Sequence, residues 1–133
     1  MSVIEVSWFR GSDRVILFEF PDVWDWNDFW DAKSRSDAMT DSVTHNCAIL
    51  LHMPARVSMP DNALSQGRSL LSKRHPRVTL FVMVTPNAFA RNLMRILSQL
   101  YVSRRGMLQT AQSLDETAKV LQQMGFVPSE NHT

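Results

Sequence analysis

Residues 77–101 read RVTLFVMVTPNAFARNLMRILSQLY, and the fold that the sequence predicts depends most on this stretch. Its first part, residues 78–84, is an unbroken apolar run rich in β-branched and aromatic residues, which is typical of a strand covered by protein on both faces. Thr85 and Pro86 then provide a helix N-cap and a proline at the first helical position. The next apolar residues recur at helical spacing and predict an inward stripe of Phe89, Leu93, Ile96, Leu97 and Leu100. The stretch therefore predicts half of a parallel βαβ unit.

Two short strand patterns precede this unit and predict a hairpin. Residues 3–9 alternate and contain Val, Ile, Trp and Phe, and residues 14–20 read RVILFEF. Between them, Gly11 can adopt the positive φ that a tight turn needs. The two segments therefore predict an antiparallel pair of strands.

A helix and a third strand are predicted next. Asp22 or Asp25 can cap a helix that runs to about Met39, with further acidic residues near the positive end of its dipole. Residues 46–53, NCAILLHM, are apolar and predict another buried strand. One side of the helix carries Trp26, Phe29, Trp30 and Lys33.

The alternation of helix and strand continues after residue 60. Asp61 or Asn62 can cap the next helix, and Gly67 within it allows a close approach to the sheet. The expected inward side of this helix consists of Ala63, Gly67, Leu70 and Leu71.

A short strand and a last helix are predicted at the end of the chain. The strand covers residues 107–111 and follows a basic turn at residues 104–106. Ser113 and Glu116 have the spacing of a capping box, and Gly125 is the expected helix stop. The inward residues of this helix are Leu114, Ala118, Leu121 and Met124. The predicted element order is ββαβαβαβα.

Length and composition indicate a single soluble domain. The chain has 133 residues, 44% of them apolar and 20% charged, and no apolar run approaches the roughly 18–20 residues of a membrane helix. We expect one domain over residues 1–127 and a flexible tail over residues 128–133. The N-terminus lacks a signal-peptide pattern, so a cytoplasmic location is expected. The lone cysteine, Cys47, is expected to be a small buried side chain.

Charge is distributed unevenly along the chain. Residues 1–61 carry ten acidic and five basic side chains, whereas residues 62–133 carry three acidic and nine basic ones. Oppositely charged halves of this kind favour either head-to-tail self-association or binding of a charged partner. A homodimer is therefore one of the expected possibilities. The simpler interpretation is that different helix faces are exposed to solvent.

Motifs of catalysis and of cofactor binding are missing from the sequence. It contains no phosphate-binding or dinucleotide-binding glycine pattern and no nucleophile elbow, and the histidines lack metal-binding spacing. The basic residues form no nucleic-acid motif, and the pI near 8.0 is modest. We therefore predict a non-enzymatic protein without a cofactor or metal, and without a nucleic-acid or membrane partner.

Aromatic residues gather in the first quarter of the chain. Packing of a helix on the sheet is the most frequent use of such residues. They can also line an apolar pocket or a partner groove. The candidates for an apolar ligand site are Trp24, Trp26, Phe29 and Trp30.

The opening hairpin followed by alternating helices and strands resembles the STAS domain of the SpoIIAA-like, anti-sigma factor antagonist type. Residues 46–53 followed by VSMPDNALSQG look like the family's strand, D-S-S-G loop and helix start, with Asp61 on the motif's aspartate. Residues 79–86, TLFVMVTP, are similar to the family's strand and S-P opening. The resemblance implies an α/β fold, with a mixed five-stranded sheet and four helices mainly on one face.

The resemblance also implies a regulatory protein-binding module. In that family, a partner kinase phosphorylates a serine at the start of the second helix and thereby ends binding. Asn62 and Ala63 occupy those positions here, so the hydroxyl of the switch is missing. An anti-sigma-factor-like kinase or a relative is the implied partner, and its expected binding surface consists of Ser58, Met59, Asp61, Asn62, Ala63 and Ser65. Because some SpoIIAA-like proteins resemble lipid-binding folds, a carrier or sensor of a small apolar, lipid-like ligand is the alternative.

Overall fold

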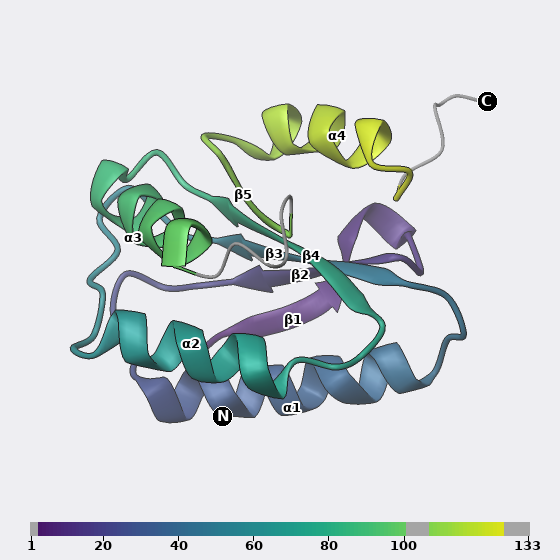
Figure 1. Cartoon of the computed structure of the whole chain (residues 1–133), viewed down its shortest axis with the longest axis horizontal. Helices are drawn as coiled ribbons and strands as arrows, with labels where there is room; N and C mark the ends of the chain where they lie inside the picture. Colours follow the sequence, from purple (N-terminus) through teal and green to yellow (C-terminus); the bar gives the residue numbers. More distant parts are fainter. Residues whose placement is uncertain (1–2, 101–106, 127–133) are drawn as a thin grey trace.

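The computed structural model describes residues 3–100 and 107–126, which form a five-stranded sheet and four α-helices (Figure 1). The strands are β1 (Glu5–Trp8), β2 (Val15–Glu19), β3 (Cys47–His52), β4 (Val78–Val84) and β5 (Leu108–Ala111). The helices are α1 (Trp26–Asp41), α2 (Ala63–Lys73), α3 (Ala88–Leu100) and α4 (Leu114–Gln123), and a short 3₁₀ helix, η1 (Phe9–Gly11), follows β1. The predicted α/β class, the five strands and the four helices are confirmed.

The strands lie in the sheet in the same order as in the sequence. β1 pairs antiparallel with β2, and β2, β3, β4 and β5 pair parallel to one another. Both the hairpin and the parallel βαβ unit are therefore confirmed. Parallel crossovers are almost always right-handed, so successive crossovers in one direction place their helices on one face.

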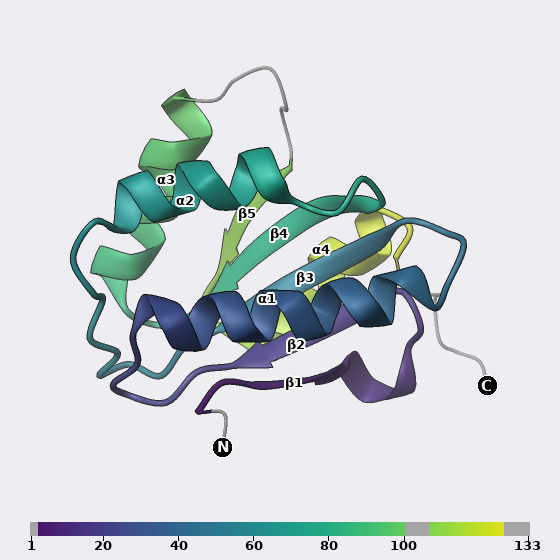
Figure 2. The ribbon, with the colours of Figure 1, turned by 90° about the horizontal axis from the view of Figure 1, so that it is seen from below.

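Two hydrophobic cores lie on opposite faces of this sheet. The first is shared with α1, α2 and α3 and includes Phe29, Leu70 and Met94. The second lies under α4 and includes Leu50 and Leu121. Figure 2 shows α1 and α2 on one side of the sheet and α4 on the other. Most of the helices therefore share a face, as expected, and α4 covers the reverse face.

The start and the inward face of α3 differ from the prediction. Asn87, and not Thr85, caps the helix, because its Oδ1 accepts a hydrogen bond from the Ala90 N–H at 3.0 Å. Phe89 and Leu100 are 63% and 61% exposed, whereas Ala90, Met94 and Leu97 are buried. The predicted stripe was therefore wrong at its two ends.

Three smaller expectations also need correction. Asn62 precedes α2 in the left-handed region, with φ 69°, and makes no side-chain cap. A Cβ on Gly67 would lie 2.5 Å from Leu97 Cδ1, so the glycine allows close approach to α3 and not to the sheet. Met124 is 43% exposed and does not face the core.

Other local expectations are confirmed. Asp25 caps α1 in a reciprocal capping box with Asp28, and Gly11 and Gly125 both have positive φ. Cys47 is fully buried. The expected basic turn at residues 104–106 and the expected tail at residues 128–133 lie outside the described residues. Within the described part of the chain, each helix is too short or too polar to cross a bilayer.

Candidate functional site

Two hollows lie beside the loop that joins the carboxyl end of β3 to α2. Ligands of open α/β sheets usually bind outside the carboxyl ends of the strands, so this is the part of the fold in which a site is expected. The first hollow is an apolar cavity between the sheet and the helices α1, α2 and α3. The second is an open groove at the start of α2. We refer to them below as the cavity and the groove.

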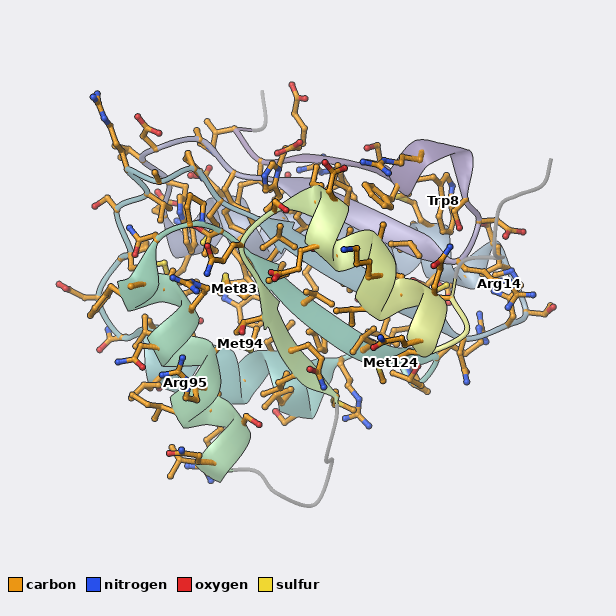
Figure 3. The ribbon with its side chains drawn as sticks, turned by 90° about the horizontal axis from the view of Figure 1, so that it is seen from above. Trp8, Arg14, Met83, Met94, Arg95 and Met124 are labelled. Atoms are coloured by element: carbon orange, nitrogen blue, oxygen red, sulfur yellow. The ribbon has the colours of Figure 1, made fainter. Side chains whose placement is uncertain are left out.

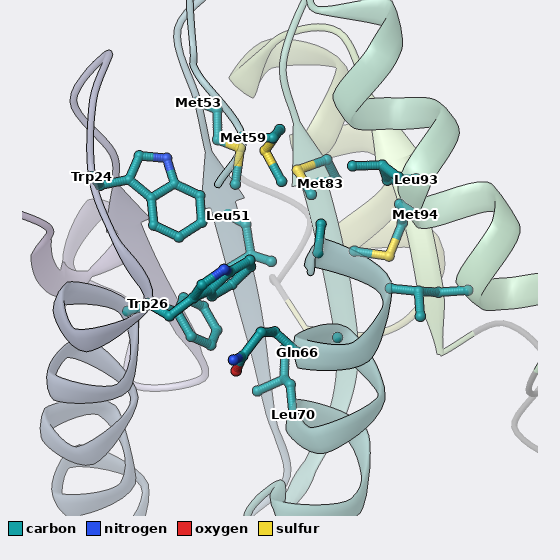
Figure 4. Close-up of a pocket in the computed structure, with 14 residues that line it drawn as sticks. Trp24, Trp26, Leu51, Met53, Met59, Gln66, Leu70, Met83, Leu93 and Met94 are labelled. Carbon is teal, nitrogen blue, oxygen red and sulfur yellow. The ribbon is translucent and has the colours of Figure 1, made fainter. Parts of the chain in front are cut away.

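The cavity has aromatic residues on one side and methionines on the other. Trp24, Trp26 and Phe29 line it from α1 and the segment before it, and Leu51 and Leu70 line it from β3 and α2. Its methionines come from the loop after β3, from β4 and from α3, and they are Met53, Met59, Met83 and Met94. Figure 4 shows the two tryptophans facing these methionines across the cavity.

Packing between aromatic rings fixes the tryptophan side of the cavity. The ring centroids of Trp24 and Trp26 are 4.9 Å apart at an interplanar angle of 85°, and Trp24 contacts Phe20 at the same centroid distance. Edge-to-face pairs of this kind are favourable beyond the area that they bury. The aromatic wall is therefore rigid, whereas the methionine wall is made of flexible side chains that repack easily.

Three indole N–H groups near the cavity differ in their hydrogen bonding. Trp26 Nε1 donates to the Asp61 carbonyl oxygen at 2.7 Å, and Trp30 Nε1 donates to Gln66 Oε1 at 2.8 Å. Trp24 is only 6% exposed, and its Nε1 has no acceptor among the described residues. A buried donor without an acceptor costs about 1–3 kcal/mol. An acceptor that entered next to this nitrogen would therefore be stabilised.

The cavity is small, at about 60 Å³. An apolar cavity of about 150 Å³ is known to remain dry and to bind benzene. A ligand of even that size can enter here only if the methionine side chains move. The cavity therefore favours a compact, mainly apolar molecule.

The groove is larger, at about 490 Å³, and open to solvent. Residues 59–65 line it on one side, and Phe89 and Leu93 of α3 line it on the other. Leu64 is 37% exposed and Phe89 is 63% exposed. Clustered exposed apolar side chains are typical of interaction sites, because soluble proteins rarely leave them uncovered without a function.

Most of the residues expected to bind a partner lie together in the groove. Met59, Asp61, Asn62, Ala63 and Ser65 all line it. Ser58 lies outside this lining, and its N–H donates to the Asp22 carbonyl oxygen at 2.8 Å.

Three of the four residues expected to form an apolar ligand site lie at the cavity, namely Trp24, Trp26 and Phe29. Trp30 is not part of its lining. Its indole instead connects α1 to α2 through Gln66.

Sequence reasoning missed the contribution of α3 to the groove. Phe89 and Leu93 were expected to face the core together with Leu97. The apolar side chains of α3 between Phe89 and Leu100 cover a wider arc of the helix than packing on the sheet alone requires. That excess width is the signal in the sequence that could have indicated a second, exposed surface.

The ionisable residues Glu19, Cys47 and His52 of β2 and β3 line neither hollow. His52 Nδ1 lies 2.7 Å from Glu19 Oε1 on the adjacent strand, and both side chains are partly exposed. Burial raises the pKa of the Cys47 thiol, which opposes formation of a nucleophilic thiolate. Within residues 3–100 and 107–126, no three His, Cys, Asp or Glu side chains are placed to hold a metal ion.

Comparison with known proteins assigns no family to the chain. No family model, no curated protein and no solved structure matches it. The function is therefore inferred from the fold and the two hollows.

Proposed function

We propose that this protein is a non-enzymatic regulatory module of the STAS, SpoIIAA-like type that binds another protein at the groove. The observation that carries the proposal is the exposure of Phe89 and Leu64 on either side of the groove. Partly exposed aromatic and aliphatic side chains around a concave surface are the usual anchors of protein interfaces. The sequential strand order and the opening hairpin support the assignment to the STAS type.

The start of α2 supports regulation without phosphorylation at this position. Asn62 and Ala63 stand where the resembling family has its phosphorylated serine. Both residues line the groove, so they are placed to contact a partner directly. We infer that partner binding is controlled by something other than a phosphate group at these two residues.

Pull-down from the native cell tests the proposal. The tagged double variant Met59→Glu/Phe89→Glu places two charges in the groove, and we expect it to lose proteins that the wild type retains. Val23→Glu is the matched control, because Val23 is 74% exposed and lies outside the groove. Circular dichroism confirms that each variant is folded. An identical set of bound proteins for the wild type and the double variant would rule out this surface.

A second candidate function is the carriage or sensing of a small apolar ligand. The specific observation that favours it is the buried Trp24 N–H without an acceptor beside an apolar cavity. A carbonyl oxygen on the ligand could accept this hydrogen bond, while the rest of the ligand packs against the methionines. Binding would then combine apolar burial with one directional contact, as small-molecule sites usually do.

Cyclohexanone and cyclohexane are suitable probes for this second function, because they share ring size and differ in a carbonyl oxygen. Tryptophan fluorescence titration should show binding of both to the wild type. Trp24→Phe should lower the preference for the ketone over the hydrocarbon by about 5–10-fold, since a hydrogen bond contributes about 1–1.5 kcal/mol. Trp30→Phe should leave that preference unchanged. Absence of binding by either probe, also in native mass spectrometry, would exclude the cavity as a ligand site.

A further inference from the structure

An exposed apolar stripe runs along one flank of α3. We define the α3 stripe as Phe89, Leu93, Ile96 and Leu100, which are spaced by four, three and four residues. Phe89 and Leu100 are largely exposed, and the two residues between them are half-buried. The stripe extends over about 16 Å, from the groove to the end of the helix. Figure 3 shows Met94, which is not part of the stripe, pointing from α3 toward the sheet.

The two helices at the groove carry only positive charge, whereas Asp61 lines the groove just before α2. Within their bounds α2 and α3 contain Arg68, Lys73, Arg91 and Arg95 and no acidic residue. Arg68 follows Leu64 by one helical turn. Arg95 is adjacent to Ile96 in the sequence, and Figure 3 shows Arg95 on the solvent side of α3. Both arginines are exposed.

These cations lack the carboxylate partners that other cations of the chain have. Arg10, Lys33 and Arg35 each pair with an aspartate. In the part of the chain that the structure describes, none of the four cations of α2 and α3 makes an ion pair. Lys73 lies over the Trp30 ring, and Arg95 donates a hydrogen bond to Asn92 Oδ1 within α3, but neither contact neutralises their charge. An acidic partner would therefore compete with no carboxylate of the described residues for Arg68 and Arg95, and charges of opposite sign would steer its approach.

We propose that the partner docks on the groove and the α3 stripe with an amphipathic helix whose polar flanks are acidic. This inference rests on the proposed function and specifies the chemistry of the partner. A helix of about three turns places apolar residues at i, i+4 and i+7 over the length of the stripe. Its carboxylates would then lie next to Arg68 and Arg95.

The structure disfavours a second copy of this chain as the source of that helix. α1 is the most acidic of the described α-helices, with Asp28, Asp31, Asp37 and Asp41 against Lys33 and Arg35. Its apolar residues Phe29 and Ala32 are buried in the first core, and none of the exposed large apolar side chains of the described residues belongs to it. α1 thus has the charge of the proposed partner without an apolar face to insert.

Selection from a displayed library of helical peptides of about 16 residues tests the inference with the intact protein as target. We expect the enriched peptides to carry apolar residues at helical spacing and an excess of Asp and Glu. Phe89→Ser should weaken their binding about 30-fold, as loss of an anchor residue does. Arg68→Glu/Arg95→Glu should weaken it about tenfold, and the matched control Lys119→Glu, on the opposite face of the sheet, should not.

The outcomes separate this inference from the proposed function. Enriched peptides that require Phe89 but are neutral or basic would overturn the acidic partner and leave a protein-binding groove. If no enriched peptide is weakened by Phe89→Ser, both fail. Sedimentation with phosphatidylglycerol vesicles adds a further arm, because vesicle binding that requires Phe89, without such peptides, would assign the stripe to a membrane surface and overturn the inference.

Discussion

Cys47 opens β3 with a fully buried side chain, and burial raises the pKa of its thiol. The charge of Arg77 acts in the opposite direction, but desolvation is the larger influence. The folded state therefore stabilises the neutral thiol of Cys47 relative to the thiolate. Ionisation of this group requires either unfolding or a charge inside the core.

A pH dependence of stability follows from this raised pKa. The thiol contributes its full stabilisation below its pKa in the unfolded chain, about 8.5, and this contribution is lost as the pH rises through the higher folded value. Urea unfolding between about pH 7 and about pH 10 should therefore show a steeper loss of stability for the wild type than for Cys47→Ala. Parallel curves for the two proteins would show that Cys47 is not the group responsible.

Single residues also show where reading the sequence was insufficient. The prediction that Cys47 is buried succeeded because the neighbouring residues form an apolar run. The prediction that Asn62 caps α2 failed, because a cap requires extended backbone and Asn62 has φ 69°. Residue type alone does not distinguish an asparagine that caps a helix from one that adopts the left-handed conformation before it.

At the scale of elements, the starts of α1 and α2 are contrasting cases. Asp25 accepts from the Asp28 N–H at 2.9 Å, and Asp28 accepts from the Asp25 N–H at the same distance. Asn62 makes no comparable contact at the start of α2. The first helix therefore depends on its cap, and the second depends on the packing of its buried face.

Two substitutions measure this contrast. Asp25→Ala should lower the free energy of unfolding by about 0.5–2 kcal/mol through loss of the cap. Asn62→Gly should leave it unchanged or raise it slightly, because glycine adopts a positive φ without steric cost. Urea titration of both variants under the same conditions provides the comparison. A similar loss in the two would show that Asn62 has a stabilising role that the geometry does not indicate.

The orientation of α3 illustrates how far an element could be predicted. Helical spacing identified the helix and its apolar arc, including the buried Leu97. It could not identify which part of a wide arc faces the sheet, because that depends on where α2 crosses α3 at Gly67. The exposure of Phe89 is therefore a tertiary effect.

At the scale of the whole molecule, the sequential strand order determines which strands are most protected. β2, β3 and β4 are flanked by strands on both sides, whereas β1 and β5 are the edges. Opening of an edge strand breaks the hydrogen bonds to one neighbouring strand, whereas opening of a central strand breaks the hydrogen bonds to two. Resistance to exchange should therefore be greatest at the centre.

Amide hydrogen exchange followed by NMR tests this expectation. The amides of β2, β3 and β4 should exchange slowest, with free energies close to that of global unfolding. The amides of β1 should exchange before them, because β1 has four residues and one neighbouring strand. Protection of β1 equal to that of β4 would show that the sheet opens as a single unit.

The overall architecture could be predicted because each step of it is local. An apolar strand, a turn residue and an amphipathic helix follow one another within about 30 residues, and the right-handed crossover then fixes their arrangement. The two hollows depend on contacts between distant residues, such as Trp26 with Asp61 and Trp30 with Gln66. The spacing of residues along the sequence does not predict such long-range contacts.

Met59, Ala63 and Leu93 border both the cavity and the groove. These three side chains separate the cavity from the groove. A ligand that widened the cavity would displace these side chains toward the groove, where the proposed partner helix would oppose the movement. Thermodynamic linkage then requires each occupant to change the affinity of the other by the same factor. If both proposed sites bind their ligands, occupancy of the cavity would therefore change the affinity of the groove for its protein partner.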